Sequence, residues 1–185
     1  MKRIALSLAT AVALAAPAAA DPVPLREINA YLNSFATAES SFTQINADGT
    51  VSTGSLYLER PGRARFEYDD EELLVMAGGG RLAIFDGRSN SSADQYPLAD
   101  TPLSIILERR VDLASSGMVV GQDYDGTSTR IVVQDPDRPE IGTLELVFTD
   151  DPVELRQWVV TDQSGQQTTI ALGALRTGVD VPAIL

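Results

Sequence analysis

The chain has 185 residues, with 14 basic and 26 acidic side chains, and it contains neither histidine nor cysteine. These two absences exclude disulfides, thiolate chemistry, a Ser-His-Asp triad and histidine-ligated zinc. Without Lys2 and Arg3, 12 basic residues stand against 26 acidic ones, a formal charge of −14. Because so acidic a chain is repelled by nucleic acid and by anionic membrane surfaces, we expect no nucleic-acid partner. Solubility or the habitat of the source organism is the simpler explanation of the acidity.

Residues 1–20 have the pattern of a secretory signal peptide. A positively charged start is followed by an apolar run over residues 4–16, which is too short to span a bilayer stably, and by the small residues Ala18-Ala19-Ala20. We therefore expect cleavage after Ala20 and a single mature domain, residues 21–185, outside the cytoplasm. With no cysteine at the cleavage site, the mature chain cannot carry the lipid of a bacterial lipoprotein.

The first part of the mature chain predicts one helix and then a dense series of strands. Residues 24–35 place apolar side chains at spacings of three and four, which is typical of an amphipathic helix. Alternating patterns separated by turn residues follow it, and a triple glycine joins the last two strands as a hairpin. The expected strands are residues 54–59, 63–68, 72–77 and 81–86.

A second helix is expected in the middle of the strands, in the stretch PLADTPLSIILERRVDL. Asp100 or Thr101 would be its N-cap, and Pro102 suits the first helical position. Strands resume after it, over residues 118–123, 128–134, 143–148, 154–161 and 166–172. The apolar side chains expected to share one face of this helix are Leu103, Ile106 and Leu107, and Val111 would continue the same face.

These elements predict one α+β domain with about nine or ten antiparallel strands. A single open sheet of that size must curl, so one of its faces becomes concave and apolar. Two short helices need not fill the concave side. The space left over would be a ligand cavity.

The acidic turns do not predict a catalytic or metal site. The stretch DYDG, residues 123–126, fails the spacing of a calcium-binding loop, because no glutamate follows at the twelfth position. The triple glycine lies between strands and opens no helix, so it does not form a phosphate-binding loop. No pattern places two carboxylates together on an apolar face. We therefore expect no enzyme, no cofactor and no metal.

The hairpin GSLYLERPGRARFEY, residues 54–68, carries an arginine at the end of an apolar strand face. Because alternate residues of a strand share a face, Leu56, Leu58 and Arg60 lie together, and Pro61-Gly62 then reverses the chain. Two interpretations stay open for this face, which either lines a pocket or closes a core. An ordinary solvated arginine at the end of a hairpin is the simpler alternative for Arg60.

The order of several short motifs resembles a known family. These motifs are Phe42-x-Gln44, then Gly54-x-Leu56-x-Leu58-x-Arg60-Pro61-Gly62, then Arg65-Phe66-x-Tyr68, then Thr101-Pro102-Leu103 with Ile106 and Leu107, and the closing segment LELVFTDDPVELRQWVVTDQSGQQTTIAL, residues 144–172. Together they are similar to the periplasmic outer-membrane lipoprotein carriers (LolA). The likeness covers essentially the whole mature chain.

The resemblance implies an unclosed half-barrel of antiparallel strands with a helical lid over an apolar cavity, in a periplasmic monomer. It implies triacylated lipoprotein cargo, taken from an inner-membrane ABC transporter and handed to an outer-membrane receptor lipoprotein. It also implies that Arg60 hydrogen-bonds to the lid and acts as a latch. The sequence departs from the family at Ala64, often a large apolar residue there, and in its short C-terminal extension.

A lipid- or peptide-binding sensor domain and a carrier of glycolipid or phospholipid are the alternatives to a lipoprotein carrier. For the apolar candidates, the simpler interpretation is ordinary core packing. The candidate ligand-binding residues of the cavity and lid are Leu56, Leu58, Arg60, Phe66, Tyr68, Leu74, Met76, Leu103, Ile106, Leu107, Leu146, Phe148 and Trp158.

Overall fold

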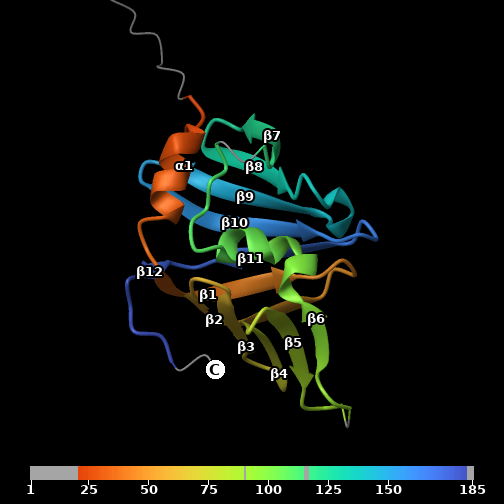
Figure 1. Cartoon of the computed structure of the whole chain (residues 1–185). Coiled ribbons are helices and arrows are strands. Elements are labelled where there is room, and N and C mark those ends of the chain that lie inside the picture. The colour runs from red at the N-terminus through yellow and green to blue at the C-terminus, as the bar shows by residue number, and fades with distance from the viewer. Residues whose placement is uncertain (1–20, 90, 115–116, 183–185) are drawn as a thin grey trace, which may run out of the picture.

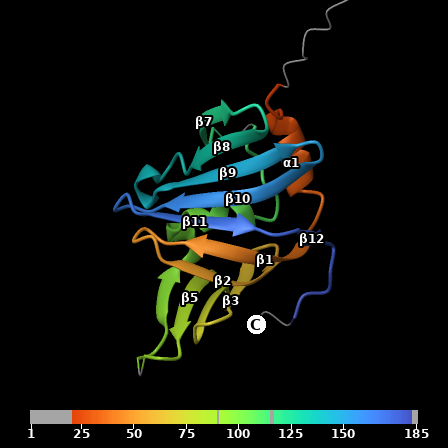
Figure 2. The same cartoon turned by 180° about the vertical axis from the view of Figure 1, so that it is seen from behind.

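One curved antiparallel sheet dominates the computed structural model, which describes residues 21–89, 91–114 and 117–182 (Figures 1 and 2). In this part of the chain the sheet has twelve strands in the order β6-β5-β4-β3-β2-β1-β11-β10-β9-β8-β7, with β12 pairing with β1 beside this path. The two outermost strands, β6 and β7, do not pair with each other, so the sheet is not closed. The strands are β1 (Thr37–Ile45), β2 (Val51–Glu59), β3 (Arg63–Tyr68), β4 (Leu73–Gly78), β5 (Arg81–Asp86), β6 (Asp94–Pro97), β7 (Val119–Tyr124), β8 (Ser128–Gln134), β9 (Thr143–Asp150), β10 (Val153–Thr161), β11 (Gln167–Leu172) and β12 (Arg176–Thr177).

Helical segments cover part of the concave side of the sheet. The helix α1 (Leu25–Leu32) packs against β10, and the 3₁₀ segment η2 (Pro102–Leu107) packs against β9 and β10. A shorter 3₁₀ segment, η1 (Leu98–Asp100), precedes η2, and η3 (Pro139–Ile141) lies in the connection between β8 and β9. We call residues 98–107 the lid, because they cross in front of the sheet in Figure 1.

The predicted α+β class and the unclosed antiparallel sheet are confirmed, but the second helix was predicted wrongly. It is a six-residue 3₁₀ segment, and the chain is extended again at Glu108. Five of its six residues are buried, so it has no polar face, and 3₁₀ geometry is typical of such short pieces. Val111 is buried but lies beyond the segment. The strand β6 was not predicted, since its sequence DQYP has no alternating apolar pattern.

The core lies between the concave face, α1 and the lid, and aromatic side chains organise its centre. The ring of Phe42 makes edge-to-face contacts with Phe66 and Tyr68, at centroid distances of 5.6 Å and 5.2 Å. Phe66 in turn contacts Trp158 at 6.4 Å. Edge-to-face pairs of this kind add about 0.5–1.5 kcal/mol each beyond the burial of their area. They join β1, β3 and β10 across the curved sheet.

Gly54 makes room for this aromatic cluster. It lies on β2 directly between Phe42 of β1 and Tyr68 of β3. A Cβ atom at this position would lie 2.0 Å from the Glu67 carbonyl oxygen and 2.8 Å from a ring carbon of Phe42. The strand therefore needs glycine here because a backbone and a ring approach closely, not because of its backbone angles.

Replacing Gly54 by alanine is expected to lower the free energy of unfolding by about 2–3 kcal/mol, because the backbone of β3 must shift to admit the methyl group. Urea denaturation measures the change. Gly121→Ala is the matched control, since its Cβ would meet Val132 at 3.4 Å, an ordinary contact. Equal effects of the two substitutions would contradict the close-packing argument.

Candidate functional site

A cavity of about 340 Å³ lies between the concave face of the sheet and the start of η2. One wall comes from β3, β4 and β5, where Phe66, Val75 and Ile84 are paired in one row across the strands. The other wall comes from β10 and β11. Most of the exposed lining is apolar, and the polar side chains come from the lid, from β1, β3 and β11 and from the turn after β10. The second wall and the lid contribute Trp158, Val160, Ile170, Pro102 and Leu103.

Four of the predicted ligand-binding residues line this cavity, namely Phe66, Tyr68, Leu103 and Trp158. Five line a second, much smaller cavity of about 20 Å³ on the side of α1. Trp158 borders both cavities and so forms the wall between them. The five residues of the small cavity are Leu56, Leu58, Arg60, Ile106 and Trp158.

The remaining predicted residues line neither cavity. Leu107, Leu146 and Phe148 are buried in the core, and Phe148 lies edge-to-face against Tyr31 of α1 at 6.2 Å. These three positions therefore have the ordinary packing role that the sequence left open.

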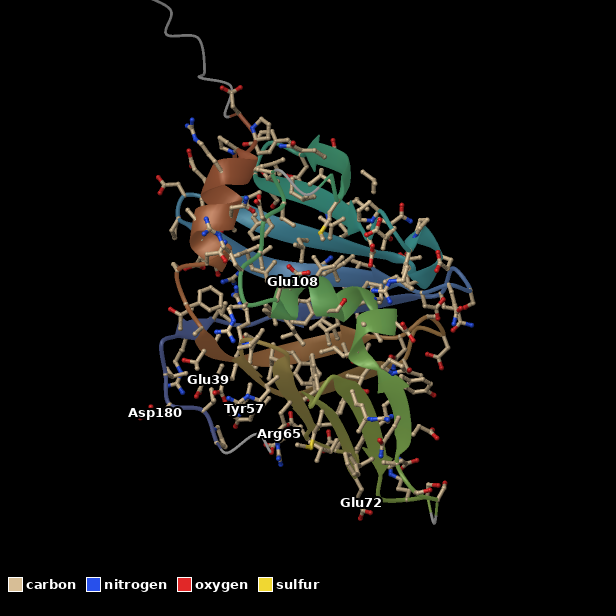
Figure 3. All side chains as sticks on the ribbon, in the orientation of Figure 1. Glu39, Tyr57, Arg65, Glu72, Glu108 and Asp180 are labelled. Atoms are coloured by element: carbon tan, nitrogen blue, oxygen red, sulfur yellow. The ribbon has the colours of Figure 1, made fainter. Side chains whose placement is uncertain are left out.

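Leu74 and Met76 lie on the opposite face of the sheet, which corrects their predicted place in the cavity. They pair with Glu67 and Arg65, whereas Val75 between them pairs with Phe66 on the cavity side. Figure 3 shows Arg65 on the part of the sheet remote from the lid. The error arises because β4 reads LLVMA, apolar on both faces, and such a strand carries no alternating signal. Pairing β4 with β5 across the Gly79-Gly80 turn places Val75 opposite Ile84. The register of this hairpin is thus the sequence signal that could have identified Val75 as the cavity-facing residue.

Arg60 is the most unusual side chain near the cavities. It is only 8% exposed, and its guanidinium carbon lies 4.7 Å from the centroid of the Phe35 ring. Its Nε has no hydrogen-bond partner in the described part of the chain. Burial lowers the pKa of Arg60 from its ordinary value, and the nearby Tyr31 opposes this shift. Since arginine stays protonated in proteins, Arg60 is a buried cation without full hydrogen bonding.

The sequence model of the family described as "Outer membrane lipoprotein carrier protein LolA" matches residues 33–185. The chain belongs to this family. The resemblance seen in its motifs is thereby confirmed. A protein named outer-membrane lipoprotein carrier protein, from Methylococcus capsulatus (strain Bath), is 24% identical over 169 residues, which cover 86% of this chain and 80% of that protein.

Solved structures of similar proteins are more distant from this LolA-family chain. A LolA superfamily protein from Nitrosomonas europaea is 9% identical, covers 86% of this chain and 96% of its own, and has a TM-score of 0.43. An outer membrane lipoprotein-sorting protein domain from Vibrio parahaemolyticus is 7% identical, with coverage of 86% and 93% and a TM-score of 0.48. The family assignment rests on the sequence model and not on these structures.

The hairpin of this LolA-family chain meets the lid through its backbone. The Gly62 N–H donates to the carbonyl oxygen of Leu107, the last residue of η2, at 2.8 Å. Among the residues described, no hydrogen bond joins the Arg60 guanidinium to the lid. The side-chain bond implied by the family is therefore replaced in this conformation by a backbone bond two residues farther along.

No described group of three or more acidic side chains could hold a metal ion, and no described helix is long and apolar enough to cross a membrane. The acidic turns instead use their carboxylates locally. Asp125 accepts hydrogen bonds from the Thr127 and Ser128 backbone, at 3.0 Å and 2.9 Å. Such bonds are typical of turns.

Tyr68 supplies a polar group in the apolar wall of the main cavity. Its hydroxyl donates to Oε1 of Gln44 at 2.7 Å, and the Gln44 amide is itself oriented by Asn46. Burial, reinforced by the charge of Glu71, raises the pKa of Tyr68 to about 12. The phenol is therefore neutral at physiological pH.

The Tyr68→Phe variant is expected to lose about 1 kcal/mol of unfolding free energy at neutral pH, because Gln44 loses its donor. The ordinary pKa of tyrosine is about 10, so the contribution of Tyr68 is fully present below about pH 10 and is lost as the pH rises through about 12. The difference between wild type and variant should therefore narrow over this window.

Urea denaturation at a series of pH values from neutral to alkaline measures this difference. Tyr96→Phe is the control, because Tyr96 is 49% exposed and the loss of its hydroxyl should change the free energy of unfolding little. If the difference in unfolding free energy between wild type and Tyr68→Phe stayed constant up to the highest pH measured, the raised pKa of Tyr68 would be contradicted.

Proposed function

We propose that this protein is a periplasmic carrier that holds the acyl chains of lipoproteins in its cavity and moves them from the inner to the outer membrane. The observation that carries the proposal is the apolar cavity of about 340 Å³ between the sheet and the lid. Membership of the LolA family supports it. A carrier of this kind binds and releases its cargo without covalent chemistry.

The size of the cavity bears on how cargo enters. A methylene group occupies about as much volume as a water molecule, roughly 30 Å³, so the cavity of about 340 Å³ suits one acyl chain. Three chains, with on the order of 40 methylenes, need several times that volume. We therefore infer that loading with triacylated cargo requires the lid to move away from the sheet.

The free energy of acyl burial explains why a carrier is needed. Each buried methylene contributes about 0.8 kcal/mol, so on the order of 30 kcal/mol opposes the exposure of three chains to water. A carrier must offer a comparable apolar surface and still release the load. A lid joined to the sheet by few polar bonds meets both needs, because it can open without a chemical step.

We propose the partners that the family resemblance implies. The cargo is a triacylated lipoprotein, the donor is an inner-membrane ABC transporter, and the acceptor is an outer-membrane receptor lipoprotein. Residues 1–20 lie outside the described residues, and we propose that they are a signal peptide removed after Ala20. The mature domain then spans residues 21–185.

A carrier of glycolipid or phospholipid is the second candidate, because a lipid with two acyl chains needs less additional volume than a triacylated lipoprotein. Native mass spectrometry of protein purified from its own periplasm separates the two. A co-purifying lipoprotein supports the first proposal. A free lipid in its place contradicts it and supports the second.

Ile84→Trp is expected to weaken binding of a dansyl-labelled undecanoic acid by roughly ten-fold. The larger ring takes the space of two or more methylenes, each worth about 0.8 kcal/mol. Fluorescence titration measures the affinity. Phe85→Trp is the matched control, since Phe85 is the next residue of β5, lies on the other face and is 42% exposed. Equal affinities of the two variants would place the ligand outside this cavity.

Arg60→Leu is expected to raise the free energy of unfolding by about 1 kcal/mol. It removes a buried donor without an acceptor, which costs about 1–3 kcal/mol, and loses a cation–π contact of about 0.5–1 kcal/mol. The variant should still bind acyl ligand but transfer it poorly to the acceptor, because closing over cargo becomes easier. Thermal denaturation and a transfer assay with purified components measure the two effects.

Arg63→Leu is the control for Arg60→Leu. Arg63 pairs with Glu59 on the other face of the same hairpin, and surface pairs of this kind contribute about 0–1 kcal/mol. Wild-type transfer by Arg60→Leu, or equal transfer defects in both variants, would contradict a role of Arg60 in release.

A further inference from the structure

A second large hollow lies beyond the end of the lid; the cavity of about 340 Å³ at the start of η2 is called the cargo cavity from here on. The segment that follows η2, residues 108–113, which we call the strap, runs alongside α1 (Figure 1). Figure 3 labels Glu108, the first residue of the strap. A groove of about 530 Å³ lies between the strap and α1, and none of its described lining residues lines the cargo cavity. We call it the basic groove, because Arg26, Arg109 and Arg110 line it.

The floor of the basic groove is fixed by two asparagine side chains. Asn33 accepts a hydrogen bond from the Val111 N–H at 3.0 Å and donates one to the Val111 carbonyl at 2.7 Å. Asn29 accepts from the Leu113 N–H at 2.9 Å and donates to a carboxylate oxygen of Asp112 at 3.2 Å. These bonds join α1 to the strap across about 80 residues of sequence and use none of the arginines. A ligand that binds here meets a preformed site, which lowers the entropic cost of binding.

The arginines of the groove are not neutralised as most others are. Within the described ranges, Arg109 and Arg110 form no ion pair, and Arg26 reaches only its neighbour Glu27, at 3.5 Å with 81% of its side chain exposed. Among the described residues of the lining, Asp112 is the single carboxylate. Most arginines elsewhere have an acidic partner: Arg63–Glu59, Arg65–Glu67, Arg130–Glu145, Arg138–Asp135, Arg156–Glu154 and Arg176–Glu39.

Three guanidinium groups line this groove, against Asp112 in its described lining and Glu27 beside Arg26, so the groove is locally positive in a mature chain of formal charge −14. Guanidinium groups bind carboxylates in a bidentate geometry, so the groove suits a ligand with closely spaced acidic groups. An extended anionic membrane is a poor match, because the acidic surface around the groove repels it. A short acidic segment of a protein can enter the groove and avoid most of that repulsion.

We infer that the basic groove docks an acidic segment of a partner protein, whose carboxylates pair with Arg109 and Arg110 and with Arg26 at the rim. The small Ala30 and the buried Val111 complete the lining and can contact the apolar stems of glutamate side chains. Because the groove and the cargo cavity are separate, the partner can dock while the cavity is occupied. The inference does not depend on what the cavity carries.

A fluorescent, end-capped hexaglutamate peptide tests the inference, with hexaglutamine as the uncharged comparison. At about 20 mM salt, where screening is weak, we expect the full mature protein to bind hexaglutamate and not hexaglutamine in fluorescence anisotropy. Arg109→Glu combined with Arg110→Glu should reduce this affinity by roughly ten-fold or more. Arg109→Gln combined with Arg110→Gln should reduce it less, and it keeps the test valid if charge reversal impairs folding.

The control is Arg81→Glu combined with Arg88→Glu, which makes the same change in net charge at two exposed arginines of the β5 region. This control should bind hexaglutamate nearly as well as wild type. If both charge-reversed proteins lost hexaglutamate affinity equally, the effect would be one of net charge alone, and the inference would be overturned. Absence of hexaglutamate binding by wild type would also overturn it, as would binding to phosphatidylglycerol vesicles that depends on Arg109 and Arg110 in place of peptide binding.

Discussion

The curvature of one open antiparallel sheet is the constraint on which the rest of the structure depends. Its concave face is apolar over most of its strands, while the helical segments in the described chain are one short α-helix and three 3₁₀ pieces. So few helices cannot cover so large a face, and the uncovered part becomes the cavity beside η2. The cavity therefore exists because the sheet has more concave surface than the helical segments can cover. Single side chains such as Trp158 only divide the uncovered space.

The lid is held by few polar contacts, which fits a part that must move. The Gly62 N–H donates to its last carbonyl, at Leu107, while at its other end the Leu98 N–H donates to Gly80 and Asp100 pairs with Arg138. The buried Arg60, which lines the small cavity with Ile106, has a donor without an acceptor. An unsatisfied buried donor lowers the stability of the closed state. The asparagine bonds from α1 to the strap hold the far end of the same segment firmly. Movement of the lid should therefore leave the strap in place on α1.

The sequence predicts the strands well where one face is polar, as in β2 and β3, because alternation then reveals both the element and its cavity side. It fails for β4, where both faces are apolar and the side of Met76 cannot be read. It also fails for β6, which pairs through its backbone alone. The cavity depends on long-range register that brings Phe66 to Trp158, and the basic groove depends on Asn33 meeting Val111 across the chain. Neither contact has a local signal in the sequence.

Trp158 is the only tryptophan of the chain, and it forms the wall between the two cavities. The fluorescence of an indole depends on the polarity of its surroundings and on nearby quenching groups. The intrinsic fluorescence of this residue should therefore change when the cavity is occupied. Its position against Phe66 at 6.4 Å also means that small displacements of the wall change its environment. The empty and loaded forms can thus be followed in real time on unlabelled protein, including during handover to a second protein.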